Sequence, residues 1–423
     1  MKIAVIGSGI SGIVASHYLS KANHQITLFE SEDYIGGHTH TIDVLNKGKI
    51  YPVDTGFIVF NDKTYPNYLR FLSELNVDYQ NTEMTFSVKN DISGLEYNGN
   101  NLDTLFAQRK NIFNIRFLRT IRDILKFNKS SKKRIENSDL SDSLTLGELV
   151  KLGGYSQGFV DDYLLPMGAA IWSTSLKNML DFPADFFLRF FENHGLLNIS
   201  ERPQWHVIKG GSNQYVKRFL NEFSGEVKLS TPIKKVQRHA DNVTLMTANN
   251  QSISFDKVIF ATHSNQVLPI LDKEITEDEQ NVLGRIGYEK NEIVLHTDTQ
   301  LLPKSQKAWA SWNYNLYDRQ HKNATLTYNM NILQSIQHDE TFCVTLNSTD
   351  RIDASKIIDT FHYDHPQFTI DAIEARKERH KVQGKNHTYF CGAYWYNGFH
   401  EDGVRSALEV CQALGTDIEI LIP

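Results

Sequence analysis

Apolar runs and a glycine-rich turn alternate at the start of the chain. Residues 3–6 form an apolar run that leads directly into the turn at residues 7–12, and residues 25–29 form a second run that ends at Glu30. Apolar runs of this length are typical of strands that are buried on both faces of a parallel sheet. The pattern therefore predicts a strand–helix–strand unit at the beginning of an α/β fold.

The glycine spacing in this turn suits the binding of a dinucleotide pyrophosphate. Gly7 permits a tight turn, Gly9 lets the backbone approach the pyrophosphate, and Gly12 lets the helix pack against the strand. The N–H groups at the helix N-terminus, around Ser11, favour negative charge, and Glu30 is positioned to hydrogen-bond an adenosine ribose. Glycine-rich turns also close ordinary βα units, but here the second strand and its terminal acid are in register. We therefore predict that these five residues bind a dinucleotide.

Signals of the same domain return at intervals along the chain. Short apolar or alternating runs predict further strands at residues 227–230, 233–239, 243–247, 257–263 and 388–393. Helical periodicity dominates residues 111–194, residues 281–380 are rich in strand patterns, and a last helix is expected over residues 401–414. We therefore predict an α/β fold with a discontinuous Rossmann-like cofactor domain and an inserted α+β substrate domain. The cofactor domain would comprise residues 1–80, 205–268 and 385–423, and the substrate domain residues 81–204 (helical) and 269–384 (sheet).

Composition narrows the class of protein. With 423 residues, of which 40% are hydrophobic, the chain can bury one large core or two ordinary ones, and its net charge of −6 argues against a nucleic-acid binder. Its cysteines, Cys343, Cys391 and Cys411, are widely spaced and form no CxxC pair, which fits a reducing cytoplasm. The first strand begins without a basic, cleavable leader, and no stretch approaches the roughly 18–20 apolar residues of a spanning helix. These features predict a cytoplasmic location.

A second pair of glycines leads to a family resemblance. After Glu30 an acidic loop leads to Gly36 and Gly37, and residues 53–57 follow soon after. This arrangement resembles the FAD-binding proteins of the glutathione-reductase-like superfamily, and nearly the whole chain resembles the flavin-containing amine oxidase superfamily. The resemblance implies bound FAD. It adds these residues to the cofactor site: Gly36, Gly37, His38 and Thr39 at the pyrophosphate, Gly56 and Phe57 near the ribityl chain, Ile233, Thr262 beneath the adenine half, and Glu401, Asp402 and Val404 at the start of a helix that points at the flavin pyrimidine.

His38 stands where amine oxidases commonly carry arginine. Imidazole can donate one hydrogen bond to phosphate or flavin, but it cannot offer a bidentate fork. The sequence has no recognised cysteinyl linkage motif, so we expect noncovalent FAD. Cys391 and a histidyl–flavin bond through His38 are the open alternatives.

A more specific resemblance covers both predicted domains. Motifs at several places are similar to the flavoprotein domain fused to the N-terminus of plant cyclopropane-fatty-acid synthases, and to its stand-alone bacterial relatives. The motifs lie at residues 54–57, 84–88, 105–108, 166–168, 171–173 and 202–205. The resemblance implies an FAD oxidoreductase linked to lipid modification, with a cyclopropane-synthase-like methyltransferase as a candidate partner. It does not name a substrate.

Four residues are candidates for the catalytic step. Phe399 stands where amine oxidases often have a tyrosine before the last helix, so the aromatic wall is kept without its hydroxyl, which favours an apolar substrate. His400 directly precedes the acid-rich helix start. His296 and Asp298 share one face of a predicted strand, where His296 could exchange a proton while Asp298 orients it. The alternative for the last two is a structural pair in a half-buried sheet. No metal site is expected, because no metal-spaced cluster occurs.

Two amphipathic stretches each allow a structural and a functional interpretation. Phenylalanines recur at helical spacing as a packed helix face or as an apolar wall for an acyl chain: Phe182, Phe186, Phe187, Phe190 and Phe191. A helix is expected from residue 111 to 128, and its basic arc comprises Arg116, Arg119, Arg122, Lys126 and Lys129. The opposite, apolar arc comprises Phe113, Phe117, Leu118, Ile121, Ile124 and Leu125. The basic arc is either solvated or attracted to anionic lipid headgroups.

The sequence thus predicts an FAD-dependent oxidoreductase that transfers a hydride or electrons at the flavin and acts on a lipid-like or otherwise apolar substrate. We expect it in the cytoplasm, with peripheral contact to the inner membrane surface and no nucleic-acid partner. Three alternatives stay open. They are a small-molecule amine oxidase, a desaturase or isomerase of the phytoene-desaturase kind, and a flavin-binding partner subunit of a lipid methyltransferase.

Overall fold

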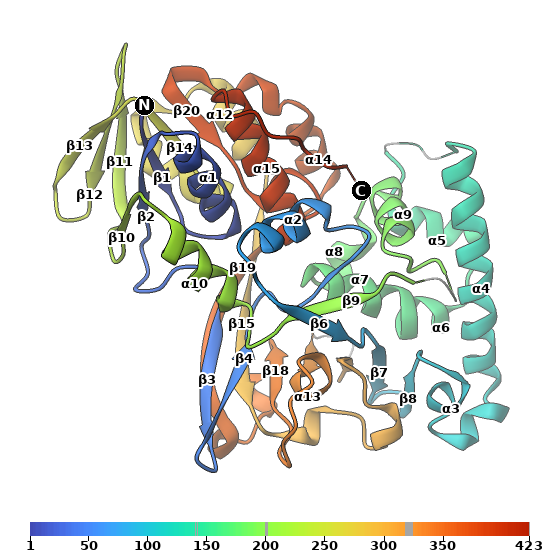
Figure 1. Ribbon diagram of the computed structural model, residues 1–423. Helices are drawn as coiled ribbons and strands as arrows, with labels where there is room; N and C mark the ends of the chain where they lie inside the picture. Colours follow the sequence, from blue (N-terminus) through green and yellow to red (C-terminus); the bar gives the residue numbers. More distant parts are fainter. Residues whose placement is uncertain (140, 142, 199–201, 318–324, 423) are drawn as a thin grey trace.

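The computed structural model describes residues 1–139, 141, 143–198, 202–317 and 325–422. Figure 1 shows a sheet-and-helix region that carries the N-terminus, and a second region in which a large sheet lies beside a group of helices. Both regions contribute residues to one large cavity, described below.

The first region is built on a five-stranded parallel sheet. Its strands are, in spatial order, β10 (Glu226–Lys228), β2 (Gln25–Phe29), β1 (Lys2–Ile6), β14 (Lys257–Phe260) and β20 (Thr388–Phe390). Successive residues of a strand point to opposite faces, so Ile3 and Val5 join one hydrophobic core while Ala4 and Ile6 join another. Because both faces are covered, the N-terminal strand is continuously apolar. This sheet confirms the predicted fold class.

Helices cover one face of this sheet, and a small sheet with further helices covers the other. The first face carries α1 (Ile10–Lys21), α2 (Pro66–Glu74), α10 (Asn213–Glu222) and α15 (His400–Ala413). The second face carries β11 (Ile233–Arg238), β12 (Val243–Thr247) and β13 (Ser252–Phe255), with α11 (Ser264–Leu271), α12 (Glu277–Leu283) and α14 (Ile370–Lys377). The sheet therefore draws its strands from three separated stretches of the chain. The predicted domain boundaries stay a proposal.

The second region contains a seven-stranded sheet. Its strands are, in order, β19 (Ile357–Pro366), β15 (Tyr288–His296), β18 (Cys343–Leu346), β17 (Leu326–Asn329), β16 (Trp312–Leu316), β7 (Phe86–Asn90) and β8 (Leu95–Asn98). Only the β16–β7 pair is parallel among these described strands. That pair joins the two predicted insertions in a single sheet.

Helices lie beside this sheet and form the right side of Figure 1. They are α3 (Leu102–Leu105), α4 (Ile115–Glu136), α5 (Leu146–Gly153), α6 (Gln157–Phe159), α7 (Leu165–Trp172), α8 (Leu176–Leu180) and α9 (Ala184–Asn193). A π-helical turn, Val160–Leu164, connects α6 to α7. No helix in the described ranges is both long enough and apolar enough to cross a bilayer.

The longest helix, α4, differs from the prediction in where it begins and in which face it buries. It begins at Ile115 rather than at residue 111. Phe117 is buried as expected, but Leu118 and Leu125 of the predicted apolar arc are 41% and 48% exposed, and Phe127, which the prediction did not include, is buried. Polar side chains take part of the buried face instead. Asp123, for example, accepts a hydrogen bond from the backbone N–H of Ser156 (2.8 Å). The helix thus leaves apolar side chains in solvent because hydrogen-bonded polar groups anchor it.

Two smaller sheets and a short helix complete the fold. They comprise β3 (Thr41–Asn46) with β4 (Lys49–Asp54), β5 (Phe60–Asn61) with β9 (Trp205–Ile208) and β6 (Tyr79–Thr82), and α13 (Met330–Leu333). The pairing of β9 with β5 and β6 brings the segment after α9 alongside the N-terminal part of the chain.

Candidate cofactor and substrate site

A cavity of about 930 Å³ begins at the carboxyl ends of β1 and β2 and extends to α7 and α9. Open α/β sheets bind ligands at this edge, and the volume lies at the upper end of ordinary ligand sites. Most of the predicted cofactor residues line it: Gly7, Gly9, Ser11, Glu30, Gly36, Gly37, His38, Gly56, Phe57, Ile233 and Thr262.

The turn between β1 and α1 leaves space beside the backbone. A Cβ added at Gly9 would meet no described atom within 4 Å, whereas a Cβ at Gly12 would lie 1.9 Å from the carbonyl oxygen of Gly7. Gly12 is therefore needed for α1 to pack on the turn, and Gly9 keeps the cavity wall open. Among the described residues, α1 has neither a side-chain N-cap nor an acid in its first turn. Its first N–H groups can therefore face an anion.

The Glu30 carboxylate is held at the cavity wall by backbone donors. Its Oε2 accepts from the N–H of Ser8 (2.9 Å), and its Oε1 accepts from the N–H groups of Ser31 (2.7 Å) and Glu32 (3.0 Å). These bonds fix its position at the end of β2. A fixed carboxylate at this position fits the hydroxyls of a ribose.

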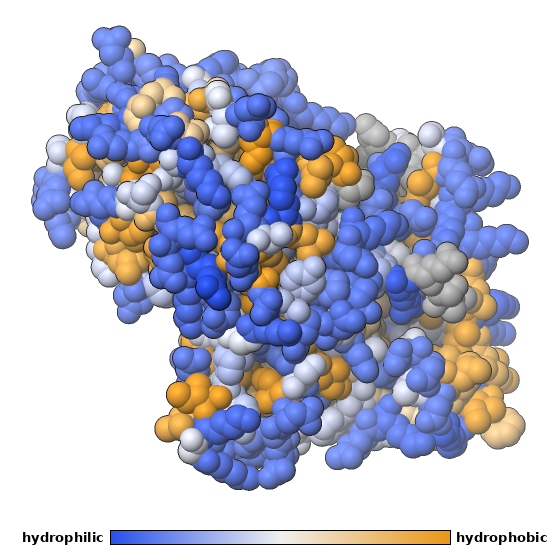
Figure 2. Space-filling model, viewed as in Figure 1, coloured by the Kyte–Doolittle hydropathy of each residue, from blue (hydrophilic) through white to orange (hydrophobic). Residues whose placement is uncertain are grey.

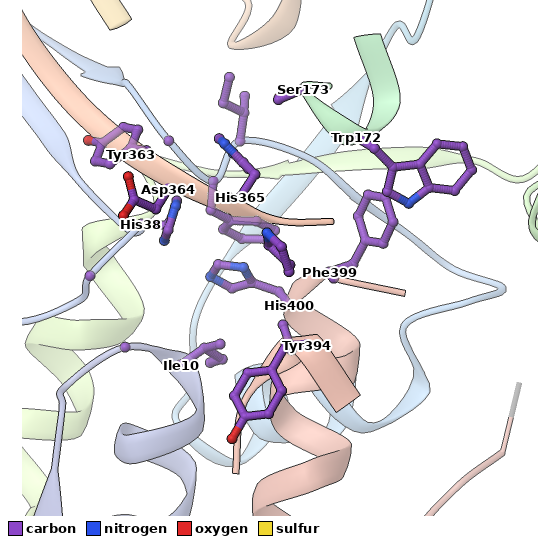
Figure 3. Close-up of a pocket in the computed structure, with 18 of the residues that line it drawn as sticks. Ile10, His38, Trp172, Ser173, Tyr363, Asp364, His365, Tyr394, Phe399 and His400 are labelled. Carbon is purple, nitrogen blue, oxygen red and sulfur yellow. The ribbon is translucent and has the colours of Figure 1, made fainter. Parts of the chain in front are cut away.

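Neutral histidines gather in the middle of the cavity. The ring of His38 lies 5.8 Å from that of His263, 5.4 Å from that of His365 and 4.9 Å from that of Tyr363. Burial lowers the pKa of His38 and of His365 to about 3, and that of His263 to about 4, so all three are uncharged at neutral pH. In Figure 3, His38 lies next to Asp364 and Tyr363.

One atom of this cluster lacks a partner. The Nε2 of His38 is buried and has no hydrogen bond to any described residue. Buried polar atoms are nearly always hydrogen-bonded, so this nitrogen fits a ligand oxygen in the cavity.

His400 closes the floor of the cavity through its own contacts. Its ring stacks on Phe57 with centroids 3.4 Å apart, and its Nε2 lies 2.9 Å from the Oγ1 of Thr39. The Thr39 hydroxyl also lies 2.6 Å from the hydroxyl of Tyr215. Burial lowers the pKa of His400 well below its usual range. Thr39 therefore hydrogen-bonds His400 from behind and, contrary to the prediction, does not line the described cavity wall.

The far part of the cavity is aromatic, and we call it the aromatic arm. It is formed by Met167, Trp172, Phe190, Phe368 and Phe399. The rings of Trp172 and Phe190 are 4.7 Å apart, and those of Phe190 and Phe399 are 5.1 Å apart. Figure 3 shows Trp172 and Phe399 on the side of the cavity opposite His38.

The phenylalanines that recur at helical spacing do not all follow one of the two interpretations, a packed helix face or an apolar wall. Phe190 belongs to the aromatic arm, whereas Phe187 and Phe191 are fully buried and stack on each other at 4.1 Å. One side of α9 therefore faces the cavity, while the other packs in the helical core.

The structure corrects the prediction that His296 and Asp298 act at the flavin. Neither is among the described residues that line the cavity. The Nδ1 of His296 accepts from the backbone N–H of Asp298 (3.0 Å), while the Asp298 carboxylate contacts Lys356 (3.3 Å). Strand β15 meets the cavity at Tyr288, and His296 lies at its other end, about 26 Å away along an extended strand. The strand was recognised, but it ends at His296, and Asp298 lies beyond it at the start of a short 3-10 helix. Periodicity also does not reveal which end of a strand reaches the site.

The helix start at residues 401–404 also needs a correction. Glu401 accepts from the backbone N–H groups of Asn67 (3.1 Å) and Tyr68 (2.8 Å) at the start of α2, and Asp402 caps its own helix at the N–H of Phe399 (2.9 Å). Val404 lies in the hydrophobic core. These three side chains do not line the described cavity, because side chains of a helix radiate sideways and only its first N–H groups point along its axis.

Sequence reasoning missed the end of β19. Residues 361–366 line the cavity and supply Tyr363, Asp364 and His365, and His263 follows β14. The signal was present as a run of alternating aromatic and polar residues, Phe361 to His365. Its importance depends on β19 lying at the edge of its sheet, which the sequence did not reveal.

Comparison with known proteins now identifies the family. Residues 10–343 match the family model described as flavin containing amine oxidoreductase. The chain belongs to this family. FAD is therefore its cofactor, as predicted.

Curated proteins resemble the sequence, and solved structures agree with the fold. The chain is 20% identical over 319 residues to an L-amino-acid oxidase of Siganus canaliculatus, a match that covers 70% of this chain and 56% of that protein. The chain spans about half the length of such curated relatives. A fatty acid isomerase from P. acnes that produces CLA superposes with a TM-score of 0.70 at 14% identity, covering 98% of both chains. Cyclohexylamine oxidase from Brevibacterium oxydans gives 0.67 at 13% identity, again over 98% of both chains.

The residues present fit FAD. The open space at Gly9, the uncapped N-terminus of α1 and the fixed carboxylate of Glu30 suit the diphosphate and ribose of the adenosine half. The unpartnered Nε2 of His38 lies farther along the same cavity, before the aromatic arm begins. The cavity thus has a polar end that suits the cofactor and an apolar end formed by the aromatic arm.

Proposed function

We propose that the protein is an FAD-dependent oxidoreductase that acts on a lipid-like or otherwise apolar substrate linked to fatty-acid modification. The observation that carries the proposal is the aromatic arm, in which rings follow one another at centroid distances of about 5 Å. Burial of hydrocarbon gains about 25 cal/mol per Å². An extended apolar chain would therefore bind well along such a wall.

FAD, when bound, supplies the redox chemistry by accepting electrons from the substrate. The protein's own residues bind, orient and exclude water. Phe399 offers a flat wall without a hydroxyl, and Phe190 and Trp172 continue that wall. His400, kept neutral by burial and bonded to Thr39, would contribute a hydrogen bond rather than a charge.

Two enzymatic alternatives make different demands on this site. A small-molecule amine oxidase would need a carboxylate or an electron-rich cage for a cationic substrate, and Asp364 beside His38 is the observation that favours it. A desaturase or isomerase would use the aromatic arm as proposed, but with no release of peroxide from amines. The substrate on which the protein acts therefore distinguishes an amine oxidase from a desaturase or isomerase.

The deciding experiment compares lipids from cells with and without the protein by mass spectrometry, together with peroxide assays on a panel of amines. We expect a change in acyl-chain modification and no peroxide from amines. Amine-dependent peroxide with unchanged lipids would contradict the proposal and support the amine oxidase.

The proposal also includes a partner protein, a lipid methyltransferase. Its support is the resemblance of the motifs at residues 84–88 and 202–205 to the flavoprotein domain of cyclopropane-fatty-acid synthases. The protein would then bind a cyclopropane-synthase-like methyltransferase. Tight binding to such a methyltransferase, with flavin that photoreduces but turns over only in the complex, would support this role.

We further propose noncovalent attachment of FAD. Burial raises the pKa of the Cys391 thiol to about 12, which disfavours the thiolate needed for a bond to flavin. Acid denaturation should release FAD unchanged. Flavin that stays with the precipitated chain would show a covalent bond, for which His38 is the first candidate.

Peripheral membrane contact is supported by the outer surface of α4. Apolar side chains are exposed there and just before the helix: Phe113, Ile115, Leu118 and Leu125. Figure 2 shows an apolar patch over the lower part of α4. The exposed cations Arg119, Arg122, Lys126 and Lys129 lie on the same helix, although the net charge of the protein is −6. Apolar and basic side chains together fit an anionic lipid surface.

Co-sedimentation with anionic and neutral vesicles tests this contact. Each cation near the surface contributes about 1 kcal/mol, so reversal of Arg119, Arg122 and Lys126 to glutamate should abolish binding to anionic vesicles and leave the flavin spectrum intact. Equally negligible binding of the unmodified protein to both vesicle types would leave α4 an ordinary solvated helix.

A further inference from the structure

One positively charged residue stands out in the cavity wall. Of all the described residues that line the cavity, Arg202 is the only lysine or arginine. It is exposed, and it precedes β9, whose first residue, Trp205, lines the same cavity. A single cation at the end of an otherwise apolar arm offers one point of electrostatic attraction for an anionic group of a ligand in the cavity.

The side chain of Arg202 is held in place, and no carboxylate of the described residues pairs with it. Its Nε donates to the carbonyl oxygen of Asn198 (3.2 Å), and the side-chain oxygen of Asn198 accepts from the Nζ of Lys132 on α4. Within the described part of the chain, no hydrogen bond or ion pair uses either Nη of Arg202. The two Nη groups are therefore free to form the paired hydrogen bonds that a guanidinium makes with a carboxylate.

A second donor lines the same cavity and lies within range of the charge of this guanidinium. Tyr163 lines the cavity, and its hydroxyl makes no hydrogen bond to a described residue. Burial raises the pKa of Tyr163 to about 12, and the nearby charge of Arg202 opposes this rise. Tyr163 therefore stays protonated and can donate to the same anion as Arg202.

Aromatic rings connect this pair of donors to the cofactor end. His194 lies 6.4 Å from Trp205 and stacks on Phe190 at 3.8 Å, and Phe190 stacks on Phe399 at 5.1 Å. Burial lowers the pKa of His194 to about 4, so this path carries no charge at neutral pH. The path thus attracts an anion at one end and is apolar along its length.

We propose that Arg202, together with Tyr163, binds the carboxylate of a long-chain carboxylic acid, whose tail follows the rings of His194, Phe190 and Phe399 toward the cofactor. This inference rests on the proposed apolar substrate and narrows it to a free acid with a defined orientation. The same charge would repel the ammonium group of an amine.

The test titrates the FAD-loaded protein with dodecanoate and with methyl dodecanoate, and follows tryptophan fluorescence and the visible flavin spectrum. Arg202→Gln should weaken dodecanoate about 10-fold, equivalent to about 1.4 kcal/mol, and leave the methyl ester unchanged. Arg202→Lys should retain most of the affinity. Arg189→Gln is the matched control, because Arg189 is also exposed but pairs with Asp185 outside the cavity wall.

Each alternative outcome has a distinct meaning. If acid and ester bind equally well and Arg202→Gln changes neither, the carboxylate site is wrong while the apolar substrate stands. If dodecyl phosphate binds far more tightly than dodecanoate and loses that advantage in Arg202→Gln, the head group is a phosphate and the free acid is wrong. If neither acid nor ester binds the unmodified holoprotein, the proposed function fails together with this inference.

Discussion

The two ends of the cavity recognise their ligands by different means. At the cofactor end, backbone groups of the turn at residues 7–12 and the carboxylate of Glu30 form the part of the site that suits the adenosine half, within the first 30 residues of the chain. At the aromatic arm, side chains from α7, α9 and the segment before α15 form the wall. Backbone recognition is local in the sequence, whereas a wall of side chains is assembled from distant segments. The first is therefore readable from the sequence, and the second requires the fold.

The largest expected effect separates packing from ligand contact at the cofactor end. Gly12→Ala would place a Cβ 1.9 Å from the Gly7 carbonyl oxygen, so we expect an unstable protein without bound FAD. Gly9→Ala is the matched variant, because its Cβ meets no described atom within 4 Å. It should fold normally, as judged by circular dichroism and thermal unfolding of the apoprotein, yet bind FAD at least about 10-fold more weakly. Normal FAD affinity in Gly9→Ala would contradict the pyrophosphate site.

Glu30 tests the adenosine part of the same end. Glu30→Ala should weaken FAD by about 10- to 150-fold, because a hydrogen bond to a charged acceptor contributes roughly 1.5–3 kcal/mol. Riboflavin, which lacks the adenosine ribose, should lose far less. Isothermal titration of the apoprotein with both ligands measures the difference. Equal losses would mean that Glu30 only supports the turn through Ser8 and Ser31.

The histidine cluster makes stability depend on pH. Burial lowers the pKa of four neighbouring histidines, so the unfolded chain takes up protons below pH 6.5 that the folded chain does not: His38, His263, His365 and His400. Their contribution is complete above pH 6.5 and is lost as the pH falls toward the folded values. Burial raises the pKa of Glu401 and of Asp402 to about 7, and their opposite contribution is present at acidic pH and lost as the pH rises to 7.

Burial also lowers the pKa of His17, His194 and His296 to about 4 and raises that of Asp54 to about 6, so histidines with a lowered pKa outnumber carboxyls with a raised one. We therefore expect the apoprotein to lose on the order of 1–4 kcal/mol of unfolding free energy between pH 6.5 and 5.5. Thermal unfolding at a series of pH values measures this loss. His263→Gln should reduce the slope, because one such histidine is removed. A melting temperature that rises on acidification would contradict the assignment.

The smallest expected effect concerns the aromatic arm. Phe190→Leu should weaken a bound hydrocarbon ligand such as methyl dodecanoate about 3- to 10-fold and leave FAD affinity unchanged, because Phe190 lines only the arm. Phe191→Leu is the control from the same helix. Phe191 is fully buried in the core and does not belong to the described cavity wall. It should lower thermal stability without changing ligand affinity, and the reverse pattern would remove Phe190 from the substrate site.

The sequence patterns alone determined the α/β fold class and the turn that meets a dinucleotide, while the identity of the cofactor as FAD came from the family resemblance. These depend on short-range patterns: an apolar strand, glycines at fixed spacing and an acid at the end of the next strand, all brought together by one βαβ unit. The sequence also proposed Phe399 and His400 at the cavity, where the structure has them. The βαβ unit and the pair Phe399 and His400 were predictable because residues that are neighbours in sequence remain neighbours in space there.

Only the tertiary structure decided which of the other candidates reach the site. His296 and Tyr363 lie on paired antiparallel strands of one sheet, yet Tyr363 lines the cavity and His296 lies at the far end of its strand. Glu401 follows His400 directly, yet its carboxylate binds the start of α2. Strand direction, sheet order and the rotation of a helix set these outcomes. They depend on packing between segments hundreds of residues apart, for which periodicity and composition carry no signal.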